Sequence, residues 1–343
     1  MVPVTGRLPA RPALVLLTGL LLAGALLALR TGPMPLSVAE VWQGLFDRQA
    51  EASVQLVVRE LRLPRLLLAM LVGAALGVSG ALLQGLFRNP LADPGLIGIS
   101  SGAALGAVAV IVLGERVFAH WDMTVPGMTL PLTAFVCALL TTAVIWRIGS
   151  RQGETHVAML LLAGIAINAI AMAGVGVMTF IADDGQLRTL TFWTMGSLAQ
   201  ADWRDLRLVS PWIVLVLLAM PLLARALNAV LLGESVALHL GHDVDRLKRR
   251  IVVMCALAVG AAVSVSGLIG FVGLVAPHLV RLTLGVDHRT LLPASALLGA
   301  VLLVLADTGA RLIVAPAEFP IGLMMALLGG PFFLALLMRR LPE

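Results

Sequence analysis

Long apolar runs recur from one end of the chain to the other, and polar positions gather in the short stretches between them. The clearest run covers residues 157–181, which contain no charged side chain. About 20 helical residues cross the hydrocarbon core of a membrane, and a helix satisfies its own backbone groups there. The pattern predicts an all-α, polytopic membrane protein with about ten transmembrane helices in a single domain, residues 1–343. The expected spans are Ala13–Leu29, Leu63–Phe87, Leu96–Leu113, Leu130–Ile148, Val157–Ile181, Leu208–Leu232, Ile251–Val265, Leu268–Leu284, Leu292–Leu312 and Pro320–Met338.

Two longer polar stretches interrupt this pattern. The first, ADDGQLRTLTFWTMGSLAQADWRD at residues 182–205, carries aromatic side chains of the kind that gather at membrane interfaces. We expect a short interfacial helix there, near Thr189–Leu198. The second, LLGESVALHLGHDVDRLKRR at residues 231–250, places small apolar residues between polar ones around Gly241. It fits a short helix–turn–helix that inserts into a groove on a cytoplasmic partner, and a plain loop is the alternative.

One part of the apolar pattern occurs twice. VGAALGVSG begins at Val72 and VGAAVSVSG begins at Val259, 187 residues later, with seven of nine positions identical. Pro90 and Pro277 end the two copies in the same register. Because five expected spans separate the copies, they cross the membrane in opposite directions, as in the inverted repeats of many transporters. Chance recurrence of small residues, which let helices approach closely in lipid, is the alternative. The predicted repeat units cover about residues 62–200 and 250–338.

Composition and charge support a membrane protein and exclude other classes. The chain is 59% hydrophobic and 13% charged, with a mean hydropathy of +1.00, so it has too few charges to cover a soluble surface. The net charge is +5, and no basic run is interleaved with aromatic residues, so we expect no nucleic-acid partner. A small excess of Lys and Arg on one side places both termini in the cytoplasm. The opposite side still carries a cluster of arginines, Arg59, Arg62 and Arg65.

The motifs of common enzymes are missing. Lys248 is the single lysine, and no G-x-x-x-x-G-K-[ST] phosphate-binding loop surrounds it, so any ATP drive must come from a partner. The histidines form no zinc-binding spacing, and no G-x-S-x-G nucleophile motif occurs. We therefore predict no catalytic residue, no metal site and no cofactor. An intramembrane enzyme is the weakest interpretation.

An ion-coupled carrier is a competing class, because such carriers place an acid within the membrane. Asp307 is the best candidate in the expected spans, and Arg311 lies four residues later on the same helix face, where the two can pair. A structural ion pair is the alternative reading. Asn168, in the middle of an expected span, is either an interhelical hydrogen-bonding residue or a residue of a transport pathway.

Several long motifs, in order along almost the whole chain, resemble the FecCD-type permease subunits of type II ABC importers, which carry cobalamin, ferric siderophores and haem. The motifs are RLPR (Arg62–Arg65), NPLADPGLIGISSGA (Asn89–Ala103), GLIGFVGLVAPHLVRL (Gly267–Leu282), DHRTLLP (Asp287–Pro293) and FPIGLMMALLGGPFF (Phe319–Phe333). The resemblance implies a homodimer with the pathway at its interface, in the bacterial inner membrane. It also implies two cytoplasmic ATPase subunits and a periplasmic binding protein. Among cargoes the motifs look most like haem permeases, with ferric siderophores and cobalamin as the alternatives.

The resemblance also implies roles for individual residues. Independently of the resemblance, Arg188 in the first polar stretch either attracts an anionic cargo such as haem or caps the interfacial helix, and Asn168 is a candidate pathway residue. The turn at GETHVAM departs from the small, hydroxyl-rich turn of the cobalamin member. The family's positions correspond to binding-protein docking at Arg62, Arg65 and Arg311; to ATPase coupling at Glu234, Ser235, Leu238, His239, Leu240, Gly241 and Asp243, within residues 233–250; and to cytoplasmic gates at Asn89, Leu91, Ala92, His156, Val157 and Ala158.

Overall fold

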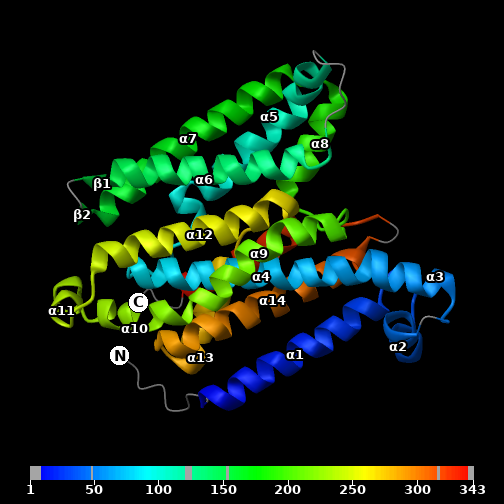
Figure 1. Cartoon of the computed structure of the whole chain (residues 1–343), viewed down its shortest axis with the longest axis horizontal. Helices are drawn as coiled ribbons and strands as arrows, with labels where there is room; N and C mark the ends of the chain where they lie inside the picture. Colours follow the sequence, from blue (N-terminus) through cyan, green and yellow to red (C-terminus); the bar gives the residue numbers. More distant parts are fainter. Residues whose placement is uncertain (1–8, 48, 120–125, 152–153, 315–316, 339–343) are drawn as a thin grey trace.

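Helices make up almost all of the part of the chain that the computed structural model describes, residues 9–47, 49–119, 126–151, 154–314 and 317–338 (Figure 1). Two short antiparallel strands, β1 and β2, pair between α6 and α7. The elements are α1 (Ala10–Arg30), α2 (Val38–Phe46), α3 (Ala52–Gln55), the π-helix η1 (Leu56–Arg62), α4 (Leu63–Leu86), the 3-10 helix η2 (Pro94–Ile97), α5 (Ile99–Ala119), α6 (Thr129–Gly149), β1 (Ser150–Arg151), β2 (Glu154–Thr155), α7 (Val157–Ile181), α8 (Asp184–Met195), α9 (Trp203–Ala219), α10 (Pro221–Leu231), α11 (Glu234–His239), α12 (Val244–Ser266), α13 (Val272–Leu284), α14 (His288–Ile313) and α15 (Ile321–Met338).

The membrane-spanning prediction is confirmed in outline. Within the described ranges, seven helices are long and apolar enough to cross a membrane, and the bent pair α9–α10 makes up to eight. Two further apolar helices, α13 and α15, are shorter. Together these correspond in order to the roughly ten expected spans.

Breaks in the helices correct several of the expected spans. The sixth span is not one straight helix, because α9 and α10 meet at a 52° bend where Pro221 begins α10. The eighth span begins at Val272 and not at Leu268, because Gly267 and Phe271 both adopt positive φ angles (66° and 67°) that no helix continues. The seventh span begins earlier than expected, since Asp243 caps the start of α12 and the helix runs through the polar residues 244–250.

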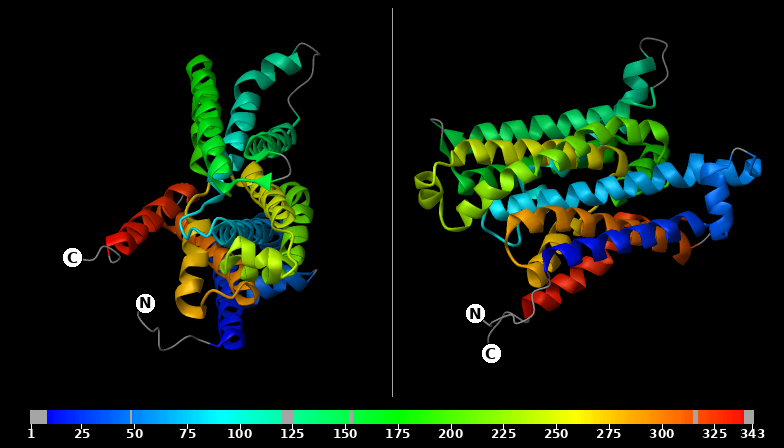
Figure 2. Two further views of the ribbon diagram at one scale, coloured as in Figure 1. Left: turned by 90° about the vertical axis from the view of Figure 1, so that its left-hand side faces the viewer. Right: turned by 60° about the horizontal axis from the view of Figure 1, so that its bottom comes forward.

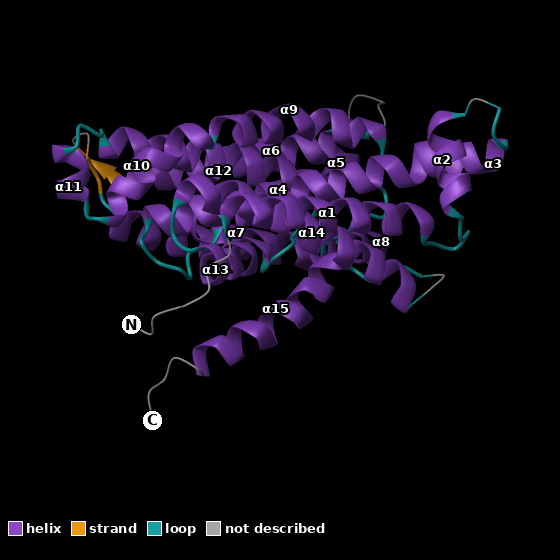
Figure 3. Ribbon diagram, turned by 90° about the horizontal axis from the view of Figure 1, so that it is seen from below, coloured by secondary structure: helices purple, strands orange, loops and turns teal. Residues whose placement is uncertain are grey.

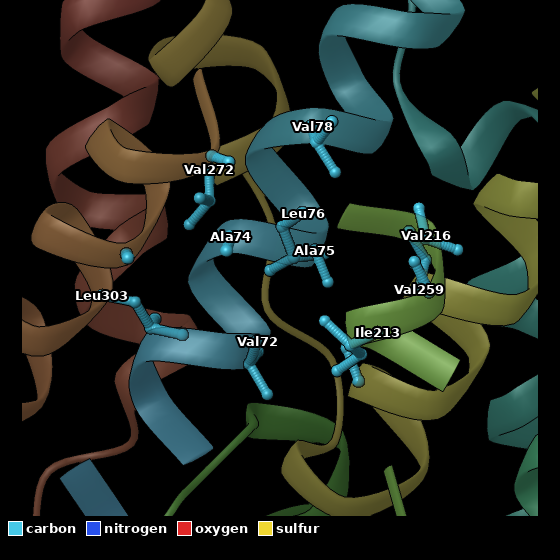
Figure 4. Packing of buried hydrophobic residues seen from close by; sticks show 14 of the residues in the cluster. Val72, Ala74, Ala75, Leu76, Val78, Ile213, Val216, Val259, Val272 and Leu303 are labelled. Atoms are coloured by element: carbon cyan, nitrogen blue, oxygen red, sulfur yellow. The ribbon is translucent and has the colours of Figure 1, made fainter. Parts of the chain in front are cut away.

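The core of the molecule forms around α4. Every residue of α4 from Val72 to Leu86 is buried, and a helix that is apolar on all sides needs neighbours on all sides. Figure 4 shows side chains of α4 packed among those of α9, α12, α13 and α14. The labelled residues are Val72, Ala74, Ala75, Leu76, Val78, Ile213, Val216, Val259, Val272 and Leu303.

The two copies of the repeated stretch lie in packed helices that run in opposite directions, α4 and α12 (Figure 1). The opposite courses agree with the inverted repeat predicted from the sequence. The backbones of the copies differ, however, since the first stays helical to Leu86 while the second breaks after Ser266. The proposed extent of the repeat units, residues 62–200 and 250–338, stays a prediction.

α5, α6 and α7 form a second group of packed helices beside this core (Figures 1 and 2). α15 leans away from the other helices, as the view from below shows (Figure 3). α7 leaves large apolar side chains uncovered, among them Ile165, Ile170 and Phe180, which is 90% exposed. Such a face needs lipid or a second protein chain to cover it.

Candidate functional site

Arg65 is the centre of a buried charge cluster where α4 and α14 meet, near α2 at one end of the molecule. Its Nε and Nη2 atoms donate to Asp307 of α14 at 2.8–3.2 Å, and its Nη1 atom donates to Glu318 at 2.7 Å. Asp307 also pairs with Arg311 at 3.3 Å, one helical turn further on. Two guanidinium groups therefore share one carboxylate that is itself buried, and Glu318 extends the network to the chain segment before α15.

Arg62 and Arg311 use their remaining donors on the end of α1. Arg62 donates to the backbone carbonyls of Leu29 and Met34, and Arg311 donates to those of Ala28 and Thr31. The last carbonyls of a helix have no partners within the helix, so these arginines satisfy them. The two side chains thus fix the end of α1 to α4 and α14.

The docking role of Arg62, Arg65 and Arg311 stays a prediction, but the structure does not show these residues as free surface charges. The three residues are only 7%, 8% and 9% exposed, and each guanidinium group is engaged with partners inside the chain. They therefore do not present free charges at the surface in this structure. The carboxylates and carbonyls around each side chain are the partners that a buried arginine requires.

The surroundings of Asp307 differ from those that a proton-coupled carrier requires of its acidic residue. A proton-carrying acid exchanges its proton with water or with another titratable group, whereas Asp307 is 2% exposed and holds two arginines. The two ion pairs engage both carboxylate oxygens of Asp307. The structural ion pair is the reading that the contacts support.

A cavity of about 630 Å³ lies beside α8, close to Glu318. Arg188 of α8, one of the predicted pathway residues, stands in its wall, 5.9 Å above the ring of Phe192. The interfacial helix expected at Thr189–Leu198 begins earlier, at Asp184, because Asp183 and Gln186 form a capping box. The walls combine aromatic, polar and charged side chains, among them Phe192, Trp193, Gln200, Asp205, Ser266 and Glu318.

Asn168, the other predicted pathway residue, serves as a connector between helices. Its side-chain amide donates to the carbonyl of Gly95 at 3.0 Å, and its oxygen accepts from the hydroxyl of Ser101. α7, η2 and α5 are thereby tied together. Of the two readings left open by the sequence, these contacts support the hydrogen-bonding one.

Asn168→Ala is expected to lower the thermal stability of the purified protein while leaving its transport rate almost unchanged. Interhelical hydrogen bonds in membrane proteins contribute about 0.6 kcal/mol on average and up to about 1.7 kcal/mol. The midpoint of thermal unfolding in detergent and the uptake rate in proteoliposomes measure the two effects. A large fall in uptake at unchanged stability would instead indicate that Asn168 is a residue of the transport pathway.

The two predicted gate segments both adjoin α7, at the end of the molecule where α11 lies. Asn89 follows the end of α4 and its side chain accepts from the Leu91 amide at 2.9 Å, while Ala92 is fully buried. His156 precedes α7, and the following Val157 and Ala158 form its first turn. η2, which follows the first gate segment, is in close contact with α7, since a Cβ on Gly164 would lie 2.0 Å from the Leu96 carbonyl.

The predicted coupling segment forms a separate short helix, α11, anchored by the fully buried Ala237. Leu238 of this helix and Leu240, directly after its end, are exposed, and Gly241 turns the chain with a φ of 83°. Asp243 then caps α12 and pairs with Arg246. The helix–turn–helix prediction is confirmed for the first helix and the turn, but the second helix is the beginning of a span. Glu234, Ser235 and His239 also lie on α11.

The family follows from a direct comparison. A model of the FecCD transport family matches residues 20–339. The chain belongs to the FecCD transport family.

Relatives of this FecCD chain are permeases. It is 46% identical over 339 residues to the Hemin transport system permease protein HmuU of Yersinia pestis, covering 98% of both chains. It is 40% identical over 325 residues to the Vitamin B12 import system permease protein BtuC of Salmonella typhimurium, covering 93% of this chain and 94% of the relative. A solved structure described as an inward-facing conformation of a putative metal-chelate type ABC transporter matches with a TM-score of 0.84 and 33% identity, over 95% of this chain and 98% of that one.

The FecCD chain is thus a polytopic permease subunit of an ABC importer and not an enzyme. Three contacts of this permease are not predicted from the sequence. Glu318 binds Arg65, Lys248 binds Glu234 and the Thr155 carbonyl, and Asp245 accepts from the Thr155 amide. Among the residues that the structure describes, no group of three or more His, Cys, Asp or Glu side chains is placed to hold a metal ion.

Proposed function

We propose that this permease moves haem across the bacterial inner membrane, driven by ATP and supplied by a periplasmic binding protein. The observation that carries the proposal is the cavity beside α8, whose wall combines Arg188 with the aromatic side chains of Phe192 and Trp193. Haem is a flat aromatic molecule with carboxylate groups. Aromatic side chains pack on flat rings, and arginine pairs with carboxylates. The relationship to HmuU supports the same cargo.

The mixed lining of the cavity suits transient binding of a cargo in transit better than tight binding. Asp205 and Glu318 stand in the same wall as Arg188, so an anionic cargo meets attraction and repulsion together. A transport pathway must bind its cargo well enough to admit it and weakly enough to release it. The proposal therefore places haem only briefly against Arg188 on its way to the inner gate.

The proposed assembly contains two copies of this chain, two cytoplasmic ATPase subunits and one binding protein. The exposed apolar face of α7 suits the second copy, with the pathway opening alternately to either side between the two. The exposed leucines of α11 suit a groove on the ATPase, which puts the α11 end and both termini in the cytoplasm. The binding protein then docks at the α2 end. There Arg62 and Arg311 hold the end of α1 in place for docking, and Arg65 holds Asp307 and Glu318.

Ferric siderophores and cobalamin are the alternative cargoes, since the BtuC relatives are named for vitamin B12. The deciding experiment measures ATP-dependent uptake by the reconstituted importer with binding proteins loaded with haem, a ferric siderophore or cobalamin. Uptake of haem alone is the expected result. Uptake of only one of the other cargoes would replace haem with that cargo, and uptake that depends on a proton gradient and not on ATP would overturn the importer.

Arg188→Gln is expected to reduce haem uptake about tenfold, because a charge-assisted hydrogen bond is worth about 1.5 kcal/mol or more and about 1.4 kcal/mol corresponds to a factor of ten. Arg204→Gln is the matched control, since Arg204 is exposed on the neighbouring helix and lies outside the cavity wall. Initial uptake rates in proteoliposomes compare the two. Equal rates in both variants would show that Arg188 only stabilises α8.

A further inference from the structure

Lys248 joins the coupling helix to the strands that precede α7. It lies in the second turn of α12, and its side chain is only 6% exposed. Its ammonium group pairs with Glu234, the first residue of α11, at 2.7 Å. The same nitrogen donates to the carbonyl oxygen of Thr155 in β2 at 3.0 Å. One buried cation therefore contacts two elements that are far apart in the sequence.

A second contact fixes the same strand. The Thr155 amide donates to the carboxylate of Asp245, three residues before Lys248 on α12, at 2.8 Å. Both backbone groups of Thr155 are thus bound to the start of α12. Thr155 is followed by His156, the residue directly before α7, so β2 cannot be displaced without moving the first turn of α7.

The surroundings leave this connection room to move. β1 and β2 have two residues each, which makes them too short to be stable as an isolated ladder. A cavity of about 380 Å³ lies beside them, with Trp146, Ser150, Thr155 and Asp245 in its wall. α11 itself is a single short helix between two positive-φ glycines, Gly233 and Gly241. A short helix with turns at both ends can shift as a unit, and its first residue is held by Lys248.

We propose that Lys248 is the positioning residue that transmits displacement of α11 to the start of α7 and so to the gate at residues 156–158. The proposal rests on the proposed function, in which the ATPase binds α11. When the ATPase moves α11, Glu234 moves with it, and the ammonium group draws the Thr155 carbonyl and β2 in the same direction. Coupling of this kind requires a continuous chain of contacts between the two sites, and Glu234–Lys248–Thr155 provides one.

The chemistry of the two contacts distinguishes transmission from simple stabilisation. Lys248 donates to both partners, which requires more than one donor hydrogen, and its charge forms the ion pair with Glu234. Arginine at this position meets the same requirement. Methionine preserves most of the side-chain length and removes both contacts. The exchange of Lys248→Glu with Glu234→Lys preserves the ion pair but removes the donor to Thr155.

The test uses the complete importer, reconstituted with its ATPase and loaded binding protein, and measures uptake per ATP hydrolysed. Lys248→Met is expected to retain the ATPase in co-purification and to keep ATP hydrolysis within about twofold, while uptake per ATP falls about tenfold. Lys248→Arg is expected to restore most of the uptake, and the charge-exchanged double variant is expected to remain uncoupled. Arg225→Met, at an exposed position on α10 outside residues 233–250, is the control and should behave as the unaltered chain does.

Three results would overturn the role of Lys248. Normal uptake per ATP in Lys248→Met would show that the contact transmits nothing. Parallel loss of assembly, ATP hydrolysis and uptake, with no rescue by Lys248→Arg, would make the residue a structural one. Recovery of uptake per ATP in the charge-exchanged variant would show that the contact with Thr155 is not needed for transmission. If the unaltered chain showed no ATP-dependent uptake of any cargo, the proposed function itself would fail. That outcome is distinct from failure of the Lys248 role, because it is seen without any variant.

Discussion

Gly80→Ala is expected to prevent the permease from folding, although it adds a single methyl group. A Cβ at this position would lie 1.8 Å from the carbonyl oxygen of Gly273, so α4 and α13 could no longer touch. Because the obstructing atoms are backbone, no side-chain rotation relieves the clash. Overpacking of this kind costs up to about 3 kcal/mol even where neighbours can adjust, against a total stability of about 5–15 kcal/mol for a typical protein.

The yield of monodisperse protein after detergent extraction and its thermal unfolding midpoint measure this effect. Gly19→Ala is the matched control, because a Cβ on that helical glycine of α1 would meet nothing within 4 Å. It is expected to leave the yield unchanged and to raise helix stability slightly. Equal yields from the two variants would mean that α4 and α13 are further apart than described here.

Asp307→Ala is expected to have the second large effect. It removes the carboxylate shared by Arg65 and Arg311 and leaves both guanidinium groups buried beside each other. Breaking a buried ion pair by removing one partner costs about 3–5 kcal/mol, since the remaining charge is desolvated without compensation. We therefore expect loss of folded protein, measured as above, and not a folded protein with a specific transport defect.

Two further variants separate the structural role of Asp307 from proton transport. Glu318→Gln should cost less than about 1 kcal/mol, because the Glu318 side chain is 37% exposed and such pairs contribute little. Asp307→Asn should destabilise the protein strongly. A well-folded Asp307→Asn variant that had lost uptake driven by a proton gradient would contradict the ion-pair reading and favour a carrier.

The sequence predicts the spans well because a transmembrane helix needs only a local property, about 20 consecutive apolar residues. It predicts the interruptions poorly, because these depend on single backbone conformations. Nothing in GLIGF marks Phe271 as a residue with positive φ, and the bend at Pro221 lies inside an apolar stretch, residues 211–224. The polar residues 244–250 suggested a surface segment, yet they continue a span as helix.

The charge cluster shows where prediction of a site from the sequence ends. The pair Asp307–Arg311 follows from helical spacing and is present. The stronger partner of Asp307 is Arg65, 242 residues earlier in the chain, and no local pattern connects the two. From the sequence alone, Arg62 and Arg65 are therefore expected to be surface charges, whereas the fold buries both. Lys248 is a similar case. Its sequence context excludes a phosphate-binding loop but does not reveal its contact with the Thr155 carbonyl of β2.

The attachment of α1 has a consequence for the order in which the protein is built. The carbonyls that end α1 receive their donors from Arg62 and from Arg311, the latter 283 residues after Ala28. Synthesis proceeds from the N-terminus, so α1 enters the lipid long before α14 exists. The first helix to be inserted is therefore one of the last to be fixed in place, and a nascent chain that stops short of α14 leaves it without half of its anchorage.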